Sequence, residues 1–208
     1  MTKKITIVLL FALAVSECYL LYENCMLNKE VKFKDLILEK TVTERNLMKV
    51  QYTIGLENIG LNLDCDAEIL DAFGNKTTLG TYFGKTKGKN MLVCRYSDKH
   101  CRQCVEHAIG NVLKSMDSMD SLDVVFVSDN ASQRVANLQR KEFGISQYNC
   151  INCNSLGISA EDMAFPYYLA IDNKLKVNGI YVPDKSIAHL PLDSVNLGLL
   201  YMKQVVKQ

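Results

Sequence analysis

The stretch MLVCRYSDKHCRQCVEHAI, residues 91–109, places two cysteines where a strand pattern gives way to a helix pattern. Met91 to Cys94 are four consecutive apolar residues, as in a buried strand, and a short polar loop follows them. Apolar residues then recur at helical spacing, at Val105, Ala108, Ile109, Val112 and Leu113. The sequence therefore predicts that Cys101-Arg-Gln-Cys104 opens a helix directly after a strand.

Cys101 lies at or just before the first turn of this predicted helix, where the pKa of a thiol is lowered. The first turn carries N–H groups without intrahelical partners and the positive end of the helix dipole, and both favour a thiolate. We therefore expect an exposed and reactive sulfur at Cys101. Cys104 follows about one turn later on the same face, so the two cysteines can close a disulfide.

The composition allows one domain with a full hydrophobic core and an additional segment, because the chain has 208 residues. Its net charge of +1 gives no indication of a nucleic acid or another highly charged partner. The sequence has neither a glycine-rich phosphate loop of the usual form nor an HExxH metal motif. Its eight cysteines include a second CxxC pair, Cys150 and Cys153.

Residues 5–22, ITIVLLFALAVSECYLLY, form an almost entirely apolar run of the length that spans a bilayer as a helix. Lys3 and Lys4 precede it, which would keep the N-terminus in the cytoplasm and place the rest of the chain outside. We predict an uncleaved membrane anchor over residues 1–25, then a charged juxtamembrane extension over residues 26–64.

A cleaved secretory signal or a lipoprotein signal is the alternative for this N-terminal run. The small-residue pattern Ala12-Leu-Ala14 falls inside the apolar run rather than after it, which is unfavourable for cleavage. Glu17 and Asn24 precede Cys18 and Cys25, whereas a lipoprotein signal needs a small residue there. Both leading alternatives place the domain outside the cytoplasm.

Residues 65–208 have the pattern of an α/β domain. After the CxxC helix, residues 124–128 read as a buried strand and residues 130–142 as a helix. The order strand, helix, strand, helix predicts a βαβ unit in a parallel sheet. Residues 143–164 are expected to be irregular and carry the second CxxC pair.

The C-terminal part of the domain begins at Phe165-Pro166. Two strand patterns follow, residues 167–172 and 176–182, and the tight turn between them predicts an antiparallel hairpin. A last amphipathic helix is predicted from Asp193 to about Val206.

This order of elements resembles the thioredoxin fold, and more closely the TlpA/ResA-type branch of membrane-anchored thioredoxin-like proteins of the bacterial envelope. The resemblance covers residues 65–208 and rests on four features: the N-terminal apolar run, the segment LDAFGNKTTL at 70–79, the stretch 91–109, and Phe165-Pro166 ahead of a strand. It implies a central mixed sheet flanked by helices, after an N-terminal transmembrane helix.

The resemblance also implies roles for individual residues. Cys101 would be the attacking thiol and Cys104 the resolving one. Pro166 would be a cis-proline packed against the motif, and the backbone of Phe165 would pair with an incoming chain. The implied protein is a cofactor-free thiol–disulfide oxidoreductase of the bacterial inner membrane. Its single-pass anchor would leave the domain in the periplasm, where it would meet protein thiol or disulfide substrates and a redox partner protein.

The motif departs from the family pattern at two positions. The family often has tryptophan before the first cysteine and proline before the second, and this chain has His100 and Gln103 there. We expect the four nearby basic residues to make the motif electropositive and its redox couple more oxidising: Arg95, Lys99, His100 and Arg102. Among them, His100 and Arg102 are the candidates for tuning the cysteines.

Several alternatives remain open at this point. Cys101, Cys104, Cys150 and Cys153 could together form a four-thiolate zinc site, which would make the domain a metal-stabilised binding module. Cys150 and Cys153 could instead form a structural disulfide, serve as a second redox pair, or remain unpaired thiols. A non-catalytic module on the same scaffold is also compatible with the fold. Peroxidase chemistry is less favoured, because residues 94–101 lack the proline and threonine that precede a peroxidatic cysteine.

Overall fold

The structure is a computed structural model that describes residues 2–85, 90–116, 123–130 and 132–183, with side chains from residue 13 on. The chain divides into two units, Met1–Met48 and Lys49–Gln208. Helix α1 (Thr2–Asn58) supplies all of the described part of the first unit and continues into the second. The predicted C-terminal helix, residues 193–206, lies outside the described residues.

No helix is long and apolar enough to cross a membrane among the residues whose side chains are described. The apolar run 5–22 begins within residues 5–12, whose side chains lie outside that set. The membrane anchor therefore stays a prediction.

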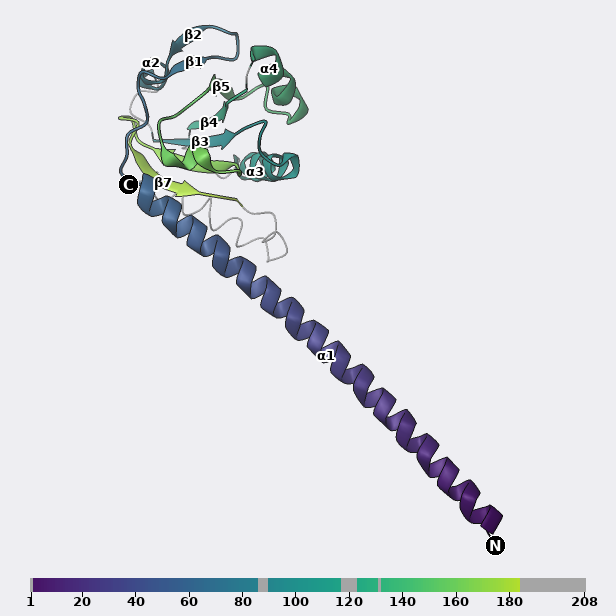
Figure 1. The fold of residues 1–208 in the computed structure, drawn as a ribbon. Coiled ribbons are helices and arrows are strands. Elements are labelled where there is room, and N and C mark those ends of the chain that lie inside the picture. The colour runs from purple at the N-terminus through teal and green to yellow at the C-terminus, as the bar shows by residue number, and fades with distance from the viewer. Residues whose placement is uncertain (1, 86–89, 117–122, 131, 184–208) are drawn as a thin grey trace. The chain divides into compact units, whose positions relative to one another are not determined.

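The second unit contains a mixed sheet in the order β2-β1-β5-β4-β3-β6-β7 (Figure 1). The strands are β1 (Glu68–Leu70), β2 (Lys76–Thr78), β3 (Met91–Tyr96), β4 (Asp123–Ser128), β5 (Asn149–Cys153), β6 (Tyr167–Ile171) and β7 (Val177–Tyr181). The helices are α2 (Leu79–Gly84), α3 (Arg102–Ser115), α4 (Gln133–Glu142) and the 3-10 helix η2 (Ser159–Asp162).

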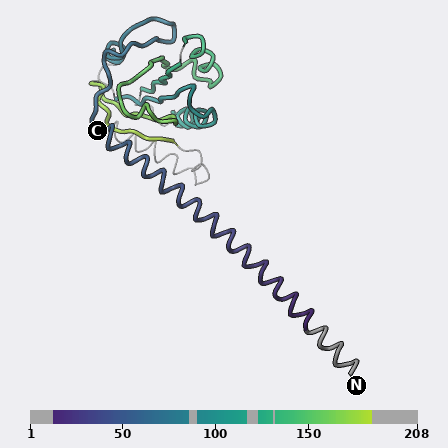
Figure 2. The backbone as a smooth tube through the Cα atoms, in the orientation of Figure 1, coloured from purple at the N-terminus to yellow at the C-terminus, as the bar shows by residue number. Residues whose placement is uncertain are grey.

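The predicted βαβ unit is confirmed at the centre of this sheet. Strand β3 pairs with β4 in parallel, and β4 pairs with β5 in parallel, with α3 and α4 as the connections along the chain. The predicted hairpin is also confirmed, since β6 and β7 pair antiparallel and β6 joins the other edge of β3. The chain path through these elements can be followed in Figure 2.

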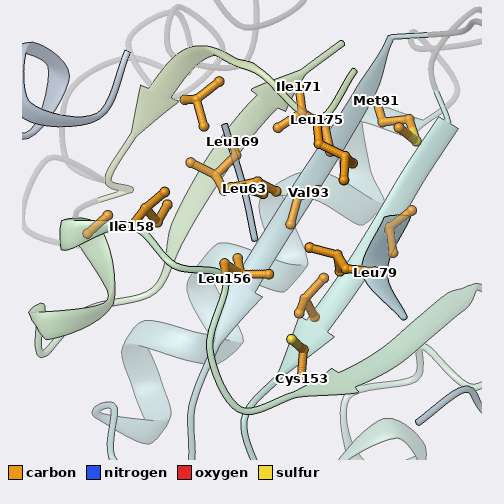
Figure 3. Packing of buried hydrophobic residues seen from close by; sticks show 14 of the residues in the cluster. Leu63, Leu79, Met91, Val93, Cys153, Leu156, Ile158, Leu169, Ile171 and Leu175 are labelled. Carbon is orange, nitrogen blue, oxygen red and sulfur yellow. The ribbon is translucent and has the colours of Figure 1, made fainter. Parts of the chain in front are cut away.

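Alternate residues of the strands supply two separate cores, one on each face of the sheet. Leu92 and Cys94 of β3 lie in the cluster that holds the apolar stripe of α3, namely Val105, Ala108, Ile109 and Val112. Met91 and Val93 lie in the other cluster, with Leu79 of α2 and Leu169 of β6 (Figure 3). The α3 helix is thus fixed by burial of one face, so its N-terminus has a defined place above β3.

The last turns of α1 belong to this second unit. Ile54 is buried in the core cluster that contains Met91 and Val93. The Gln51 side chain donates to the carbonyl of Ile180 at 2.7 Å and accepts from the amide of Val182 at 2.8 Å. These two bonds extend the edge of β7 with a side chain in place of a further strand.

Residues 143–164, predicted to be irregular, contain the strand β5 and the 3-10 helix η2, so that prediction is wrong. The sequence of β5, Asn-Cys-Ile-Asn-Cys, has two asparagines, which are depleted in strands. Tertiary contacts outweigh this preference here. Asn152 is buried, its side-chain oxygen accepts from Ser128 Oγ and the Asn130 amide, and its NH₂ group donates to the Asn130 carbonyl, all within 2.8–2.9 Å.

Candidate active site

The two cysteines of the first motif lie at the N-terminus of α3, as the sequence predicts. Cys101 is the N-cap residue, and its carbonyl accepts from the amides of Cys104 at 2.9 Å and Val105 at 3.1 Å. Cys101 is exposed and Cys104 is partly buried. One thiol is therefore open to another molecule, while the second lies about one turn along the helix, roughly 5 Å away, which suits a disulfide.

The loop that leads from β3 to Cys101 is closed by reciprocal hydrogen bonds between Ser97 and His100. The Ser97 amide donates to His100 Nδ1 at 3.1 Å, and the His100 amide donates to the Ser97 carbonyl at 3.2 Å. The amide of Lys99 donates to Ser97 Oγ at 3.1 Å. Because Ser97 is buried, this turn fixes the residue immediately before Cys101 to the end of β3.

The contacts of the His100 ring define a neutral imidazole. Nδ1 accepts a hydrogen bond, so it carries no proton, and the ring also donates to the backbone of Met163. Burial lowers the pKa of His100 below its usual value, and it outweighs the nearby carboxylates of Asp129 and Asp98, which act in the opposite direction. The ring therefore joins the cysteine loop to the segment that precedes β6.

Arg95 is buried, and acceptors around its guanidinium compensate its positive charge. Its guanidinium donates to the carbonyls of Ser128 at 3.0 Å, Cys153 at 2.7 Å and Asn154 at 3.1 Å. It also pairs with Glu161 of η2 at 2.8 Å. The arginine joins the ends of β3, β4 and β5 to η2, which is a structural role.

The other basic side chains near the motif are also compensated. Arg102 pairs with Glu106 at 3.0 Å and with Glu142. Lys99 lies 4.0 Å from Asp129. With His100 neutral and Arg95 paired, the predicted electropositive surrounding is wrong, because carboxylates that are distant in the sequence converge on these cations. The expected shift toward an oxidising couple loses its physical basis.

The Phe165–Pro166 bond is trans, since the described residues contain no cis peptide bond. The expected cis-proline is therefore wrong for this structure. The trans form is the intrinsic preference of an X–Pro bond, by about 0.5–1 kcal/mol. Pro166 is buried directly ahead of β6, whereas Phe165 is 49% exposed.

Cys150 and Cys153 lie on opposite faces of the sheet. Cys150 packs in the α3-side core and Cys153 in the other core. Their thiols donate to the carbonyls of Ile145 and Ser155 at 3.3 and 3.0 Å. Three residues of strand span about 10 Å, beyond the reach of a disulfide. A structural disulfide or a second redox pair is therefore excluded for β5 as folded, which leaves two buried thiols.

The four-thiolate zinc site is excluded by the same strand geometry. One tetrahedral ion cannot take ligands from both faces of β5. The sheet register also places Cys150 level with Phe126 and Cys94, seven residues before Cys101 in the chain. Over the described part of the chain, no group of three or more Cys, His, Asp or Glu side chains is arranged to hold a metal ion.

Three residues near the motif were not identified from the sequence: Asp129, Glu161 and Met163. Asp129 had a usable signal, because it directly follows β4 and the carboxyl ends of parallel strands meet at one edge of a sheet. Glu161 and Met163 had none, since they lie in a stretch without periodicity.

Comparison with known proteins supports the fold. No family model and no curated protein matches the chain. A solved structure of a protein assigned to electron transfer in Aquifex aeolicus VF5 matches with a TM-score of 0.51 and 15% identity, over 72% of this chain and 94% of that one. The fold is thioredoxin-like.

Other solved structures match with lower TM-scores. The peroxidoxin BcpB of Mycobacterium tuberculosis is 12% identical over 72% of this chain and 96% of its own, with a TM-score of 0.48. The thioredoxin domain of a thiol-disulfide oxidoreductase from Bacteroides vulgatus is 17% identical over 65% of this chain and 99% of its own, with a TM-score of 0.43. At such identities the similarity concerns the fold, and function must be argued from the site.

Proposed function

We propose that this protein is a thiol–disulfide oxidoreductase that uses Cys101 and Cys104 as its redox couple. The observation that carries the proposal is the placement of an exposed Cys101 at the N-cap of a 14-residue helix, with Cys104 partly buried in its first turn. The positive end of the helix dipole lies at that turn and stabilises a thiolate at the N-cap.

The reaction follows from the two positions. The Cys101 thiolate attacks one sulfur of a substrate disulfide, which breaks that bond, forms a mixed disulfide and releases a thiolate that takes up a proton. The Cys104 thiolate then attacks Cys101, which forms the Cys101–Cys104 disulfide and releases the second substrate thiol. Two electrons pass from the dithiol to the substrate, and the reverse sequence oxidises a dithiol substrate.

The proposal extends to substrates of protein size. The exposed Cys101 is open to a peptide segment that carries a cysteine, and Phe165, ahead of β6, is itself half exposed. We further propose a redox partner protein that resets the couple, because each turnover leaves the enzyme in the opposite oxidation state. The chemistry requires no cofactor, since the electrons reside on the two sulfurs.

A redox titration of the full-length chain tests the proposal. We expect Cys101 and Cys104 to form and lose one disulfide together across a series of glutathione ratios, as mapped by thiol trapping and mass spectrometry. Cys65, which is exposed outside the motif, provides the matched control and should at most form a mixed disulfide with glutathione. If Cys101 and Cys104 titrate independently, the dithiol mechanism is wrong.

We also propose that residues 1–25 anchor the protein in a bacterial inner membrane, with the domain in the periplasm. The apolar run 5–22 and the two preceding lysines support this. Replacing Leu13 and Val15 with arginine is expected to shift the protein into the soluble fraction, because each arginine in mid-span costs about 3 kcal/mol.

Carbonate extraction of membranes measures this shift. Phe33→Arg, outside the run, serves as the control and should remain in the pellet. Retention of the double variant in the membrane pellet would contradict anchoring by this segment.

A further inference from the structure

His100 contacts both segments that flank the candidate active site. On one side its ring accepts from the buried amide of Ser97, in the loop that ends at Cys101. On the other side the ring donates to the backbone of Met163, two residues before Phe165. We propose that His100 is a positioning residue that holds the cysteine loop against the Met163–Pro166 segment, and that only the neutral imidazole does so.

The Met163 side of this bridge is itself fixed to the core. Met163 is the C-cap residue directly after η2, and its amide donates to the Ala160 carbonyl at 3.3 Å. Glu161 of the same helix pairs with the buried Arg95 of β3 and accepts from the Leu156 amide at 2.8 Å. The His100 ring therefore joins two parts of the site that are each anchored to the sheet, so its loss would loosen their spacing without removing either anchor.

The neutral state follows from the hydrogen-bond roles. An imidazolium carries N–H groups on both nitrogens, so Nδ1–H would oppose the N–H donor of Ser97. Protonation would break that bond and release one side of the bridge. The proton comes from solvent, and the ring regains its neutral form when the proton leaves.

The charges around the ring set the balance between these two states. Asp98 and Lys99 come from its own loop, Arg95 from β3, and Asp129 from the end of β4. Burial and Arg95 favour the neutral ring, while the two aspartates and the hydrogen bond to Met163 favour the imidazolium. Asp129 Oδ1 is buried and accepts no hydrogen bond from the described residues, so this atom is the acceptor toward which an imidazolium would turn.

This inference rests on the proposed function only for its kinetic consequence. The first test needs no substrate and no variant. In the full-length chain, NMR is expected to show the Nε2–H tautomer of His100 at pH 7.5. As the ring titrates, the protection factor of the Ser97 amide, corrected for the intrinsic pH dependence of exchange, should fall about tenfold or more. Titration of the ring with no change at Ser97 would overturn the proposal.

The second test uses two variants of the full-length chain, each of which keeps only one of the two hydrogen bonds made by the His100 ring. His100→Asn keeps an acceptor near the Nδ1 position but cannot reach Met163, and His100→Gln extends a donor toward Met163 but removes the Nδ1 acceptor. We expect both to reduce oxidised glutathione about tenfold more slowly than the parent at pH 7.5, because the reacting groups lose their fixed geometry. The ratio of parent to variant should approach one as the pH falls through the titration of His100.

His107→Asn, on α3 outside this bridge, is the matched control and should keep the parent rate and pH profile. A variant-to-parent ratio that stays constant from pH 5 to 7.5 would show that His100 does not act through its neutral form, and the proposal would be wrong. If Cys101→Ser keeps its activity, the redox function fails instead. The Ser97 measurement still decides the role of His100 in that case.

Discussion

Replacing Cys101 with serine is expected to abolish disulfide exchange, with a loss of at least about a thousandfold, because it removes the exposed thiol and leaves only the partly buried Cys104 in the motif. Cys104→Ser should behave differently. It keeps the attacking thiol but cannot resolve the mixed disulfide, so the enzyme should accumulate covalently joined to its substrate. The rate of reduction of oxidised glutathione and intact-mass spectrometry of the full-length chain measure the two effects.

The asymmetry between these variants is the decisive feature. Exposure assigns attack to Cys101 and resolution to the partly buried Cys104. If Cys101→Ser instead traps the mixed disulfide and Cys104→Ser is inert, the roles are reversed. Cys65→Ser changes an exposed cysteine elsewhere and should leave both readouts unchanged, which controls for thiol loss in general.

Arg95→Ala is expected to lower the free energy of unfolding by about 3–5 kcal/mol, the usual cost of breaking a buried ion pair from one side. The side chains of Arg95 and Glu161 are 4% and 15% exposed, so the carboxylate would be left with little water to replace its partner. Three carbonyls at the ends of β4 and β5 would also lose a charged donor. Urea unfolding followed by tyrosine fluorescence gives the measurement, since the chain has no tryptophan.

Arg102→Ala provides the matched control for this loss. Arg102 also pairs with two carboxylates, but it lies on the exposed side of α3, where solvent screens the interaction. We expect little change in its urea midpoint. Equal destabilisation by the two substitutions would mean that the Arg95–Glu161 pair is no more important to the fold than a surface pair.

The centre of the fold was predictable because the apolar pattern there fits only one order of secondary structure, namely strand, helix and strand. Residues 91–94 and 124–127 are continuous apolar runs, and the apolar residues of α3 recur every three to four positions, so the pattern predicts a parallel βαβ unit. The same pattern predicts that Cys101 lies at the start of a helix, and the structure confirms it. The hairpin after Pro166 was predictable for a similar reason, since two strand patterns flank a short polar turn.

The features that the sequence predicted wrongly, strand β5 and the charge around Arg95, depend on contacts between residues that are distant in the sequence. Strand β5 looked irregular because its asparagines are weak strand formers, and only Ser128 and Asn130 give Asn152 its partners. Arg95 was expected to make the motif electropositive, because two of its acceptors, the Cys153 carbonyl and Glu161, follow it by 58 and 66 residues. Local patterns contain no information on such pairs.

The three buried cysteines lie in two different cores, so their reactivity can report local unfolding of each core separately. Cys94 and Cys150 are sealed under α3, and Cys153 is sealed on the opposite face. Burial raises the pKa of Cys150 to about 11 and raises the pKa of Cys94 and Cys153 as well, so an alkylating reagent meets unreactive thiols while the domain is closed. The order in which these three thiols become alkylated would therefore record which layer of the domain separates first from the sheet.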